Sequence, residues 1–400
     1  MKKTMFFIFL IISILFAGCS NEETGKKEDN DLDNVADSQE FESINDHEES
    51  DGDDGFEDFD ENEIDDNNET PDEESDTESD YPEKIEVEDG SPFYSPEDIG
   101  FFEVDGLSNG EWILFNSWAV QNALMAYSPE TKETRTVFYA NRVWSFGAGG
   151  NGDIYFSSVD PKMEENWAIP VNDAIQYTWH YKTGKKPVQL TSGRINDESH
   201  VPSVDGKKLY FSRRSNFYYE YSEETGLIFE NDFWRIVEYD METKDEYYLT
   251  EHSNNEFADL YPAPCSDGTI LFNRRLATGG NSIMRLFPDS GKLKTEVESA
   301  AIPSSTSDGK KVIYLWNNGI YLSDCSDLSK AEIVLPIKVA TTVFALSPDK
   351  NKIAYRKRSS EQSSCEDIFI YDIDEKSEEK IVDCNETGIW ATDISWIRVE

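Results

Sequence analysis

The sequence has few basic residues, few histidines and few cysteines. It contains 36 Lys+Arg against 82 Asp+Glu, only 4 His and 5 Cys, and its net charge is −46. A chain this acidic and without a basic stripe is repelled by phosphate backbones, so nucleic acid is excluded as a natural partner. The sequence also lacks a Gly-x-Ser-x-Gly elbow, a Walker loop and a Gly-x-Gly-x-x-Gly motif. Nothing in it therefore indicates an acyl hydrolase or a phosphate-binding loop.

Long hydrophobic runs are also absent, apart from residues 5–16. This run is shorter than the roughly 20 residues that a membrane-spanning helix needs, but it follows Lys2-Lys3 and suits a signal peptide. It ends in Leu15-Phe16-Ala17-Gly18-Cys19, which resembles the bacterial lipobox, with Phe16 where the family prefers leucine. The resemblance implies a signal peptide over residues 1–18 and a lipid on Cys19 (diacylglycerol, palmitate) that attaches the protein to the membrane. The alternative is an ordinary secretory signal followed by an incidental cysteine.

Residues 19–92 form a strongly acidic segment. Residues 20–90 hold 33 Asp+Glu against three Lys, and such a composition cannot bury enough apolar surface to offset chain entropy. We expect a disordered tether that separates a folded domain from the membrane. Two alternatives are a segment that gathers Ca²⁺, although it lacks the spacing of an EF-hand loop, and an address for surface export just after Cys19.

Residues 93–400 repeat one strand–turn–strand pattern. In residues 201–212, Asp205-Gly206 supplies a tight turn whose residues need positive φ, and the apolar residues after it alternate as in a half-buried strand. Further copies occupy residues 262–272, 303–314 and 344–355, and more degenerate copies occupy 109–115 and 151–156. Turns spaced by about 40 to 60 residues, with a second hairpin in each interval and no helical periodicity, are typical of β-propeller blades.

These copies resemble the TolB-type propeller repeat, whose core reads Pro-x-Trp-Ser-Pro-Asp-Gly and is followed by an Ile-Tyr-x-x-Asp strand. The best matches are Ser347-Pro348-Asp349 and Ile368-Phe369-Ile370-Tyr371-Asp372. The copies and the resemblance predict an all-β fold, a six-bladed β-propeller after a disordered acidic linker. Trp396 is expected in a last strand that returns to close the ring. A seven-bladed propeller is the alternative if residues 84–102 contribute more than one strand.

Four cysteines remain after Cys19, and an exported protein folds where disulfides form. Cys365 and Cys384 flank the last predicted hairpin and lie nearly opposite each other at its open end, which predicts a bridge. Cys265 and Cys325 are expected on the same face of neighbouring blades, which allows a second bridge. Free or buried thiols are the alternative, and zinc is not expected because no C-x-x-C spacing occurs.

Histidines and carboxylates gather before the inner strands of two adjacent predicted blades. His200 with Asp197, and His252 with Asp259, are expected at one end of the central channel. Such oxygen and imidazole ligands suit Ca²⁺ or Mn²⁺, and a metal there would make the channel the site of a lyase or hydrolase. The alternative is a polar channel mouth with no cofactor and no catalytic residues.

Arginines and aromatic residues supply the remaining candidates. Arg213 and Arg274, with the arginines that follow them, are expected to be surface cations or an anion-binding site. Two predicted insertions, at about residues 159–175 and 215–232, carry or adjoin aromatic residues. Loops on rigid scaffolds often carry recognition, and Tyr and Trp are favoured at binding surfaces, so we expect these aromatics to be exposed and to bind a partner. The alternative is that these aromatics cover the core of the propeller. The candidate partner-binding residues are Trp167, Trp179, Tyr218 and Tyr219.

The sequence thus predicts a monomeric, membrane-anchored envelope lipoprotein whose propeller binds a protein or glycan and is not an enzyme. In a Gram-negative cell, Ser20 after Cys19 resembles the signal for outer-membrane sorting. The competing interpretation is a metal-dependent lyase or hydrolase that acts on an anionic substrate in the channel.

Overall fold

Residues 81–400 are described in a computed structural model. Cys19 and most of the predicted tether lie outside the described residues. None of the helices in the described part is long and apolar enough to cross a membrane. The gaps in the described part are 88–89, 118–121, 164–173, 216–217, 223–225, 231–233, 254–255, 338–342, 359–365, 388–390 and 392.

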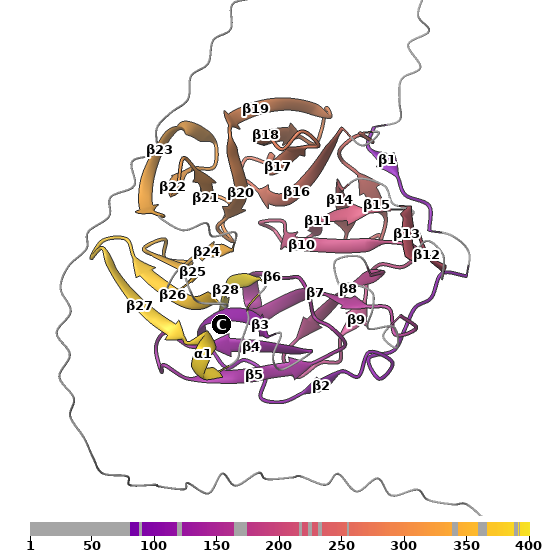
Figure 1. Cartoon of the computed structure of the whole chain (residues 1–400), viewed down its shortest axis with the longest axis horizontal. Helices are drawn as coiled ribbons and strands as arrows, with labels where there is room; N and C mark the ends of the chain where they lie inside the picture. Colours follow the sequence, from indigo (N-terminus) through magenta and orange to yellow (C-terminus); the bar gives the residue numbers. More distant parts are fainter. Residues whose placement is uncertain are drawn as a thin grey trace, which may run out of the picture. The chain divides into compact units, whose positions relative to one another are not determined.

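The described residues are almost all β-strand, and their sheets form a ring (Figure 1). Three sheets are four-stranded antiparallel meanders, and another has five strands. A nine-stranded sheet contains two further meanders, joined only by the parallel pairing of Asn196 with Gln176. Counted as meanders, the described strands give six blades, which is the number that the turn spacing predicts.

We number the blades along the chain and give the innermost strand first. Blade 1 contains β28 (Ile394–Val399), β3 (Gly110–Ser117), β4 (Ala123–Tyr127), β5 (Thr134–Tyr139) and β2 (Phe102–Glu103); blade 2 contains β6 (Phe146–Ala148), β7 (Asp153–Val159), β8 (Gln176–Lys182) and β9 (Val188–Gln189); blade 3 contains β10 (Asn196–Pro202), β11 (Lys208–Arg214), β14 (Arg235–Asp240), β15 (Glu246–Tyr248) and β1 (Glu83–Lys84). Blade 4 contains β16 (Phe257–Pro264), β17 (Ile270–Leu276), β18 (Asn281–Phe287) and β19 (Lys292–Glu298); blade 5 contains β20 (Ala300–Ser305), β21 (Lys311–Trp316), β22 (Gly319–Asp324) and β23 (Asp327–Pro336); blade 6 contains β24 (Phe344–Leu346), β25 (Lys352–Arg358), β26 (Glu366–Asp372) and β27 (Ser377–Val382).

The C-terminal strand closes the ring. β28 pairs antiparallel with β3 along its whole length, from Ile394 opposite Phe115 to Val399 opposite Gly110, and the two strands lie side by side in Figure 1. Trp396 lies in this strand and is buried. The predicted closure is confirmed, and it leaves no unpaired inner edge on β3.

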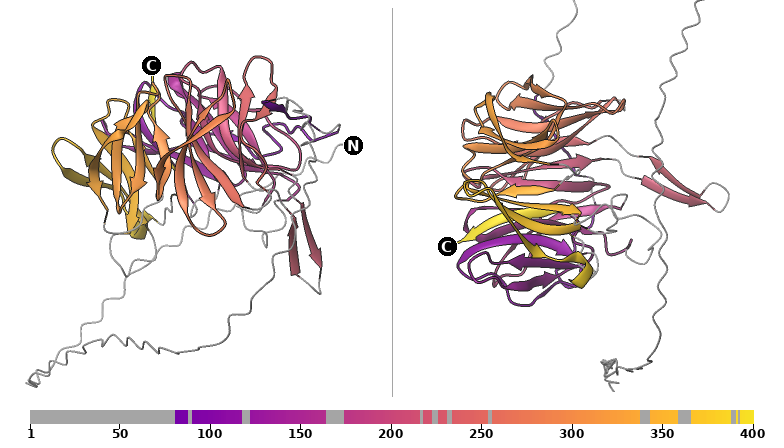
Figure 2. Two further views of the ribbon diagram at one scale, coloured as in Figure 1. Left: turned by 90° about the horizontal axis from the view of Figure 1, so that it is seen from above. Right: turned by 60° about the vertical axis from the view of Figure 1, so that its left-hand side comes forward.

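Tight turns follow the inner strands where the sequence predicts them. Gly206, Gly268 and Gly309 have φ of 70°, 85° and 62°, and Lys350 adopts the same left-handed conformation in blade 6, with φ of 69°. We call this end of the ring the turn rim, and we call the opposite end, where the inner strands begin, the start rim. The side views in Figure 2 show neighbouring sheets packed face to face between the two ends.

The segment before blade 1 runs along the outer edges of three blades. β1 pairs with β15 of blade 3, and β2 pairs with β5 of blade 1. Between them, the backbone N–H of Tyr94 donates to Gln189 of blade 2 at 2.6 Å. Each short strand extends an existing sheet, so the described segment adds no seventh blade. Ile85, which precedes the predicted boundary at residue 93, packs on the core of blade 3.

One predicted insertion contains a small sheet of its own. β12 (Tyr218–Ser222) and β13 (Gly226–Glu230) pair only with each other within the described residues. The other predicted insertion falls largely on residues 164–173, which are not described. Two short helical turns complete the described elements: η1 (Gly150–Gly152) and α1 (Cys384–Thr387).

Candidate functional site

In two successive blades, an aspartate on the inner strand pairs with an arginine on the next strand. In blade 3, Asp197 accepts hydrogen bonds from Arg213 at 2.7 Å (Nε to Oδ1) and 3.0 Å (Nη2 to Oδ2). In blade 4, Asp259 accepts two bonds of 2.8 Å from Arg274. Both carboxylates are fully buried. Bidentate pairs of this kind are strong and fix geometry, so Arg213 and Arg274 are internal partners and the prediction of surface cations is wrong for them.

The pair in blade 3 continues into a buried polar network that reaches blade 2. Asp197 also accepts a hydrogen bond from the Thr178 hydroxyl at 3.0 Å, and Arg213 also binds Glu246. His200 Nε2 lies 2.9 Å from Thr178 Oγ1. Burial and the charge of Arg213 lower the pKa of His200 to about 4, against the opposite effect of Asp197. The imidazole is therefore neutral at pH 7. Because the Thr178 hydroxyl donates its proton to Asp197, His200 Nε2 donates to Thr178.

The four predicted metal ligands do not come together as a metal centre. No group of three or more His, Cys, Asp or Glu side chains in the described part of the chain is arranged to hold an ion. Asp197 and Asp259 each bind an arginine, His200 binds Thr178, and His252 is exposed. Because the arginines occupy the carboxylate oxygens that a cation would need, this arrangement does not support the predicted site.

The inner strands of blades 3, 4 and 5 carry the same irregularity just after the aspartate position. In each blade the register with the second strand shifts, and the shift contains a left-handed residue. These residues are Ser199, Tyr261 and Ile302, with φ of 59°, 55° and 57°. A β-bulge re-aims the side chains around it. Since the strained conformation recurs in three blades, it belongs to the repeat, and the side chain placed there is what distinguishes one blade from another.

Tyr261 is the aromatic residue at this repeated position. Its side chain is 36% exposed. Burial, with the charges of Glu198 and Asp393, raises the pKa of Tyr261 to about 12, against the opposite effect of Arg275 and Arg356. These groups come from β10, β16, β17, β25 and the residue before β28. Charged groups of both signs from four blades therefore lie near one phenol at the start rim.

Asp393 is a perturbed carboxylate at the same rim. Burial raises its pKa to about 6, although its carboxylate accepts hydrogen bonds from the N–H groups of Ile394 and Phe146 and from the Ser145 hydroxyl, at 2.9, 3.3 and 3.3 Å. The charge of Arg356 also opposes the rise. The Asp393 carboxyl therefore joins the start of β28 to Ser145 and Phe146 of blade 2.

The prediction of an exposed, partner-binding aromatic residue is wrong for Trp179. Trp179 is fully buried and stacks on Phe156 with ring centroids 6.4 Å apart. It belongs to the core cluster between blades 1 and 2, because alternation along β8 directs it into the packed face of the sheet. Tyr218 and Tyr219 pair with β13 through their backbones, and the structure does not describe their side chains. Trp167 lies outside the described residues.

One predicted disulfide is confirmed. Cys265 and Cys325 are bonded, with Cα atoms 5.7 Å apart, and the bond joins blades 4 and 5 at the turn rim. Cys384 is also disulfide-bonded. Its predicted partner, Cys365, lies outside the described residues, so that pairing stays a prediction.

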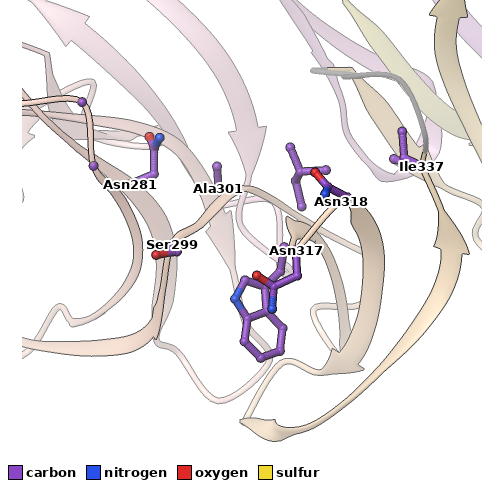
Figure 3. Close-up of a pocket in the computed structure, with 10 residues that line it drawn as sticks. Asn281, Ser299, Ala301, Asn317, Asn318 and Ile337 are labelled. Atoms are coloured by element: carbon purple, nitrogen blue, oxygen red, sulfur yellow. The ribbon is translucent and has the colours of Figure 1, made fainter. Parts of the chain in front are cut away.

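A pocket of about 530 Å³ opens between blades 4 and 5 at the start rim. Asn281 and Ser299 lie on one side of it, and the turn Asn317-Asn318 lies on the other (Figure 3). None of the lining residues is charged. Neither this pocket nor Tyr261 was predicted from the sequence. Gly279-Gly280 and Asn317-Asn318 are turn signals, but their meeting across two blades is not visible in the sequence.

Comparison with solved structures supports a β-propeller of the TolB type. TolB from Acinetobacter baumannii matches with a TM-score of 0.53 at 15% identity, over 72% of this chain and 66% of that chain, just under two thirds of its length. A chain in a nidogen/laminin complex matches with a TM-score of 0.50 at 7% identity, over 72% and 98% of the two chains. Oligogalacturonate lyase in complex with manganese matches at only 0.39, with 11% identity over 68% and 73%. No family model and no curated protein matches the sequence. These likenesses concern the fold: the chain is a β-propeller, and its fold is TolB-like.

Proposed function

We propose that the protein is a lipid-anchored cell-envelope protein whose propeller binds a protein or glycan partner at the start rim. The observation that carries the proposal is the setting of Tyr261, an exposed aromatic side chain near Glu198, Arg275, Arg356 and Asp393. A rigid ring of sheets holds these groups in place before a partner arrives, which lowers the entropy cost of binding. Tyrosine and arginine are also the residue types that contribute most to binding surfaces.

The anchor rests on the lipobox resemblance at Leu15-Phe16-Ala17-Gly18-Cys19, and the TolB-like fold suits a binding scaffold. The acidic segment after Cys19 would then separate the propeller from the membrane. Replacing Cys19 with serine removes the lipid acceptor, so we expect the variant to lose palmitate labelling and membrane attachment in the native cell. A variant that keeps both would contradict the anchor and leave the rim proposal intact.

Site-specific photo-crosslinking tests the rim. A photoreactive phenylalanine analogue replaces Tyr261 in the full-length protein, and a matched control carries it at Val204, which is 45% exposed in a turn at the opposite rim. Under the proposal, irradiation of living cells gives a discrete adduct from position 261, and Arg275→Ala reduces its yield. Protease and glycosidase treatment of the adduct then distinguishes a protein from a glycan. Equal adducts from both positions, or none from position 261, would contradict the proposal.

A further inference from the structure

The pocket between blades 4 and 5 exists because two loops at the start rim are short. Residues 277–280 join β17 to β18, and residues 317–318 alone join β21 to β22. The corresponding connections in blades 2, 3 and 6 are longer, at residues 160–175, 215–234 and 359–365. Asn317 and Asn318 both have positive φ, 44° and 60°, as the two-residue type I′ turn requires. Short loops leave the groove between these two blades uncovered.

The polar groups in the pocket are uncharged and have few protein partners. Among the described residues, no hydrogen bond involves the side chains of Asn317, Asn318 or Ser299. Asn281 accepts a hydrogen bond from Asn273 at 3.3 Å, which leaves its own amide N–H groups available to donate. Amides and hydroxyls therefore face the pocket with hydrogen-bonding capacity that only solvent or a ligand can use.

An indole forms part of the same wall. Trp316 lines the pocket and is partly buried, and its ring lies 5.0 Å from the ring of Tyr321. This contact supports the indole from behind and limits its rotation. An aromatic ring in a partly polar wall favours a ligand that has both C–H faces and hydroxyl edges.

We propose that this pocket binds a neutral oligosaccharide, with a sugar ring against Trp316 and its hydroxyls bonded to the amides of Asn281, Asn317 and Asn318. The volume of about 530 Å³ lies within the usual range of roughly 300–1,000 Å³ for small-ligand sites. This inference rests on the proposed binding function of the start rim, and it names the ligand class of a second set of residues there.

The uncharged wall of the pocket selects against the other ligand classes. An anionic sugar finds no cation in the pocket wall. A cation finds no carboxylate there. An apolar ligand would strip water from the amides and leave them without hydrogen bonds, which is unfavourable. A neutral, hydroxyl-rich ligand satisfies the wall without any of these penalties.

The test measures sugar binding to the full-length protein in a sugar-free zwitterionic detergent, by saturation-transfer NMR and calorimetry. The neutral probes are maltotriose, cellotriose and chitotriose, and trigalacturonate is the anionic probe. Asn317→Gly with Asn318→Gly deletes both amides and keeps a residue type that accepts positive φ. We expect at least one neutral probe to bind, trigalacturonate not to bind, and the double variant to raise the Kd about tenfold, as the loss of two neutral hydrogen bonds predicts.

Two further variants separate this inference from the proposed function. Lys376→Gly makes the same kind of change in a left-handed turn of blade 6 (φ 53°), and it should leave sugar binding unchanged. Tyr261→Ala tests the charged rim in the same assay, and Tyr261 does not line the pocket. If no neutral probe binds, or if the double glycine variant binds like the wild type, the pocket inference is overturned while crosslinking at Tyr261 still tests the rim. If sugar binding depends on Tyr261 or Arg275 instead, the ligand belongs to the charged rim and the inference is also overturned.

Discussion

The contact between blades 2 and 3 differs in kind from the contact between blades 4 and 5. The first is closed by buried polar side chains: Asp197 and Arg213 of blade 3 are bonded to each other, and Thr178 of blade 2 binds Asp197. The inner strands are so close that a Cβ on Gly147 would lie 1.7 Å from the carbonyl oxygen of His200. The second contact is fixed at the turn rim and opens into a pocket at the start rim.

Covalent and hydrogen-bonded connections fix the turn-rim end of the second contact. Besides the Cys265–Cys325 bond, the N–H of Ser266 donates to the carbonyl of Gly309 at 2.8 Å, and Arg285 donates to the carbonyl of Cys325 at 2.7 Å. In the first contact, Asp197 and Arg213 are both buried and paired with each other, as buried charges must be if they are not to destabilise the fold. A contact fixed at one end can remain open at the other. The contact between blades 2 and 3 is therefore structural, whereas the contact between blades 4 and 5 leaves space for the proposed ligand.

Removing Arg213 should break the closed contact and give the largest effect. Arg213→Met leaves Asp197 and Glu246 buried without their partner, and the loss of one member of a buried ion pair costs about 3–5 kcal/mol. Urea denaturation followed by circular dichroism measures the loss. The matched control is Arg274→Met, because Arg274 makes the equivalent pair but its side chain is 14% exposed, against 1% for Arg213. Equal losses in the two variants would contradict the special role of the network.

Removing the disulfide should weaken the open contact by a smaller amount. The bond closes a loop with a sequence separation of 60 residues, and a native disulfide typically stabilises a fold by about 2–4 kcal/mol, chiefly by restricting the unfolded chain. Cys265→Ala with Cys325→Ala leaves the other cysteines intact, which chemical reduction does not. Urea denaturation under the same conditions gives the difference. An unchanged midpoint would show that packing alone holds blades 4 and 5 together.

Much of the fold could be predicted because its signals are local. Each Asp-Gly turn, such as Asp205-Gly206, fixes a hairpin by the conformational freedom of its glycine, and the repetition of that hairpin fixes the class of fold. The Cys265–Cys325 bond follows from placing two equivalent blades side by side. The edge strands β1 and β2 were harder to predict, because two residues carry no periodic pattern.

The candidate site was less predictable because it depends on the register between paired strands and on how the blades pack together. Asp197 was predicted as a metal ligand, but its position directly opposite Arg213 is set by a bulge that shifts the register between Glu198 and Val201. The same kind of bulge gives Tyr261 its exposed position, so counting alternate residues along the strand fails there. Trp179 shows the opposite case: it adjoins an insertion in the sequence, but the strand it belongs to directs it into the core.

The smallest predicted effect is a change in the pH dependence of stability. The pKa of His200 is about 4 in the folded protein, against an ordinary value of 6.5. Below pH 6.5 the unfolded chain therefore binds a proton that the folded protein does not, and stability falls as the pH falls from 6.5 towards 4. His200→Gln removes the titrating imidazole, so between pH 7 and pH 5 the variant should lose about 2 kcal/mol less stability than the wild type.

Asp393 affects the pH dependence of stability in the opposite direction, because its raised pKa of about 6 stabilises the folded protein as the pH falls through that value. Asp393→Asn should therefore make the loss on acidification steeper, and urea denaturation of both variants at each pH measures the two slopes. If stability changes with pH in His200→Gln as it does in the wild type, the contact between blades 2 and 3 does not hold His200 neutral. The difference between that contact and the contact between blades 4 and 5 is then smaller than their geometry indicates.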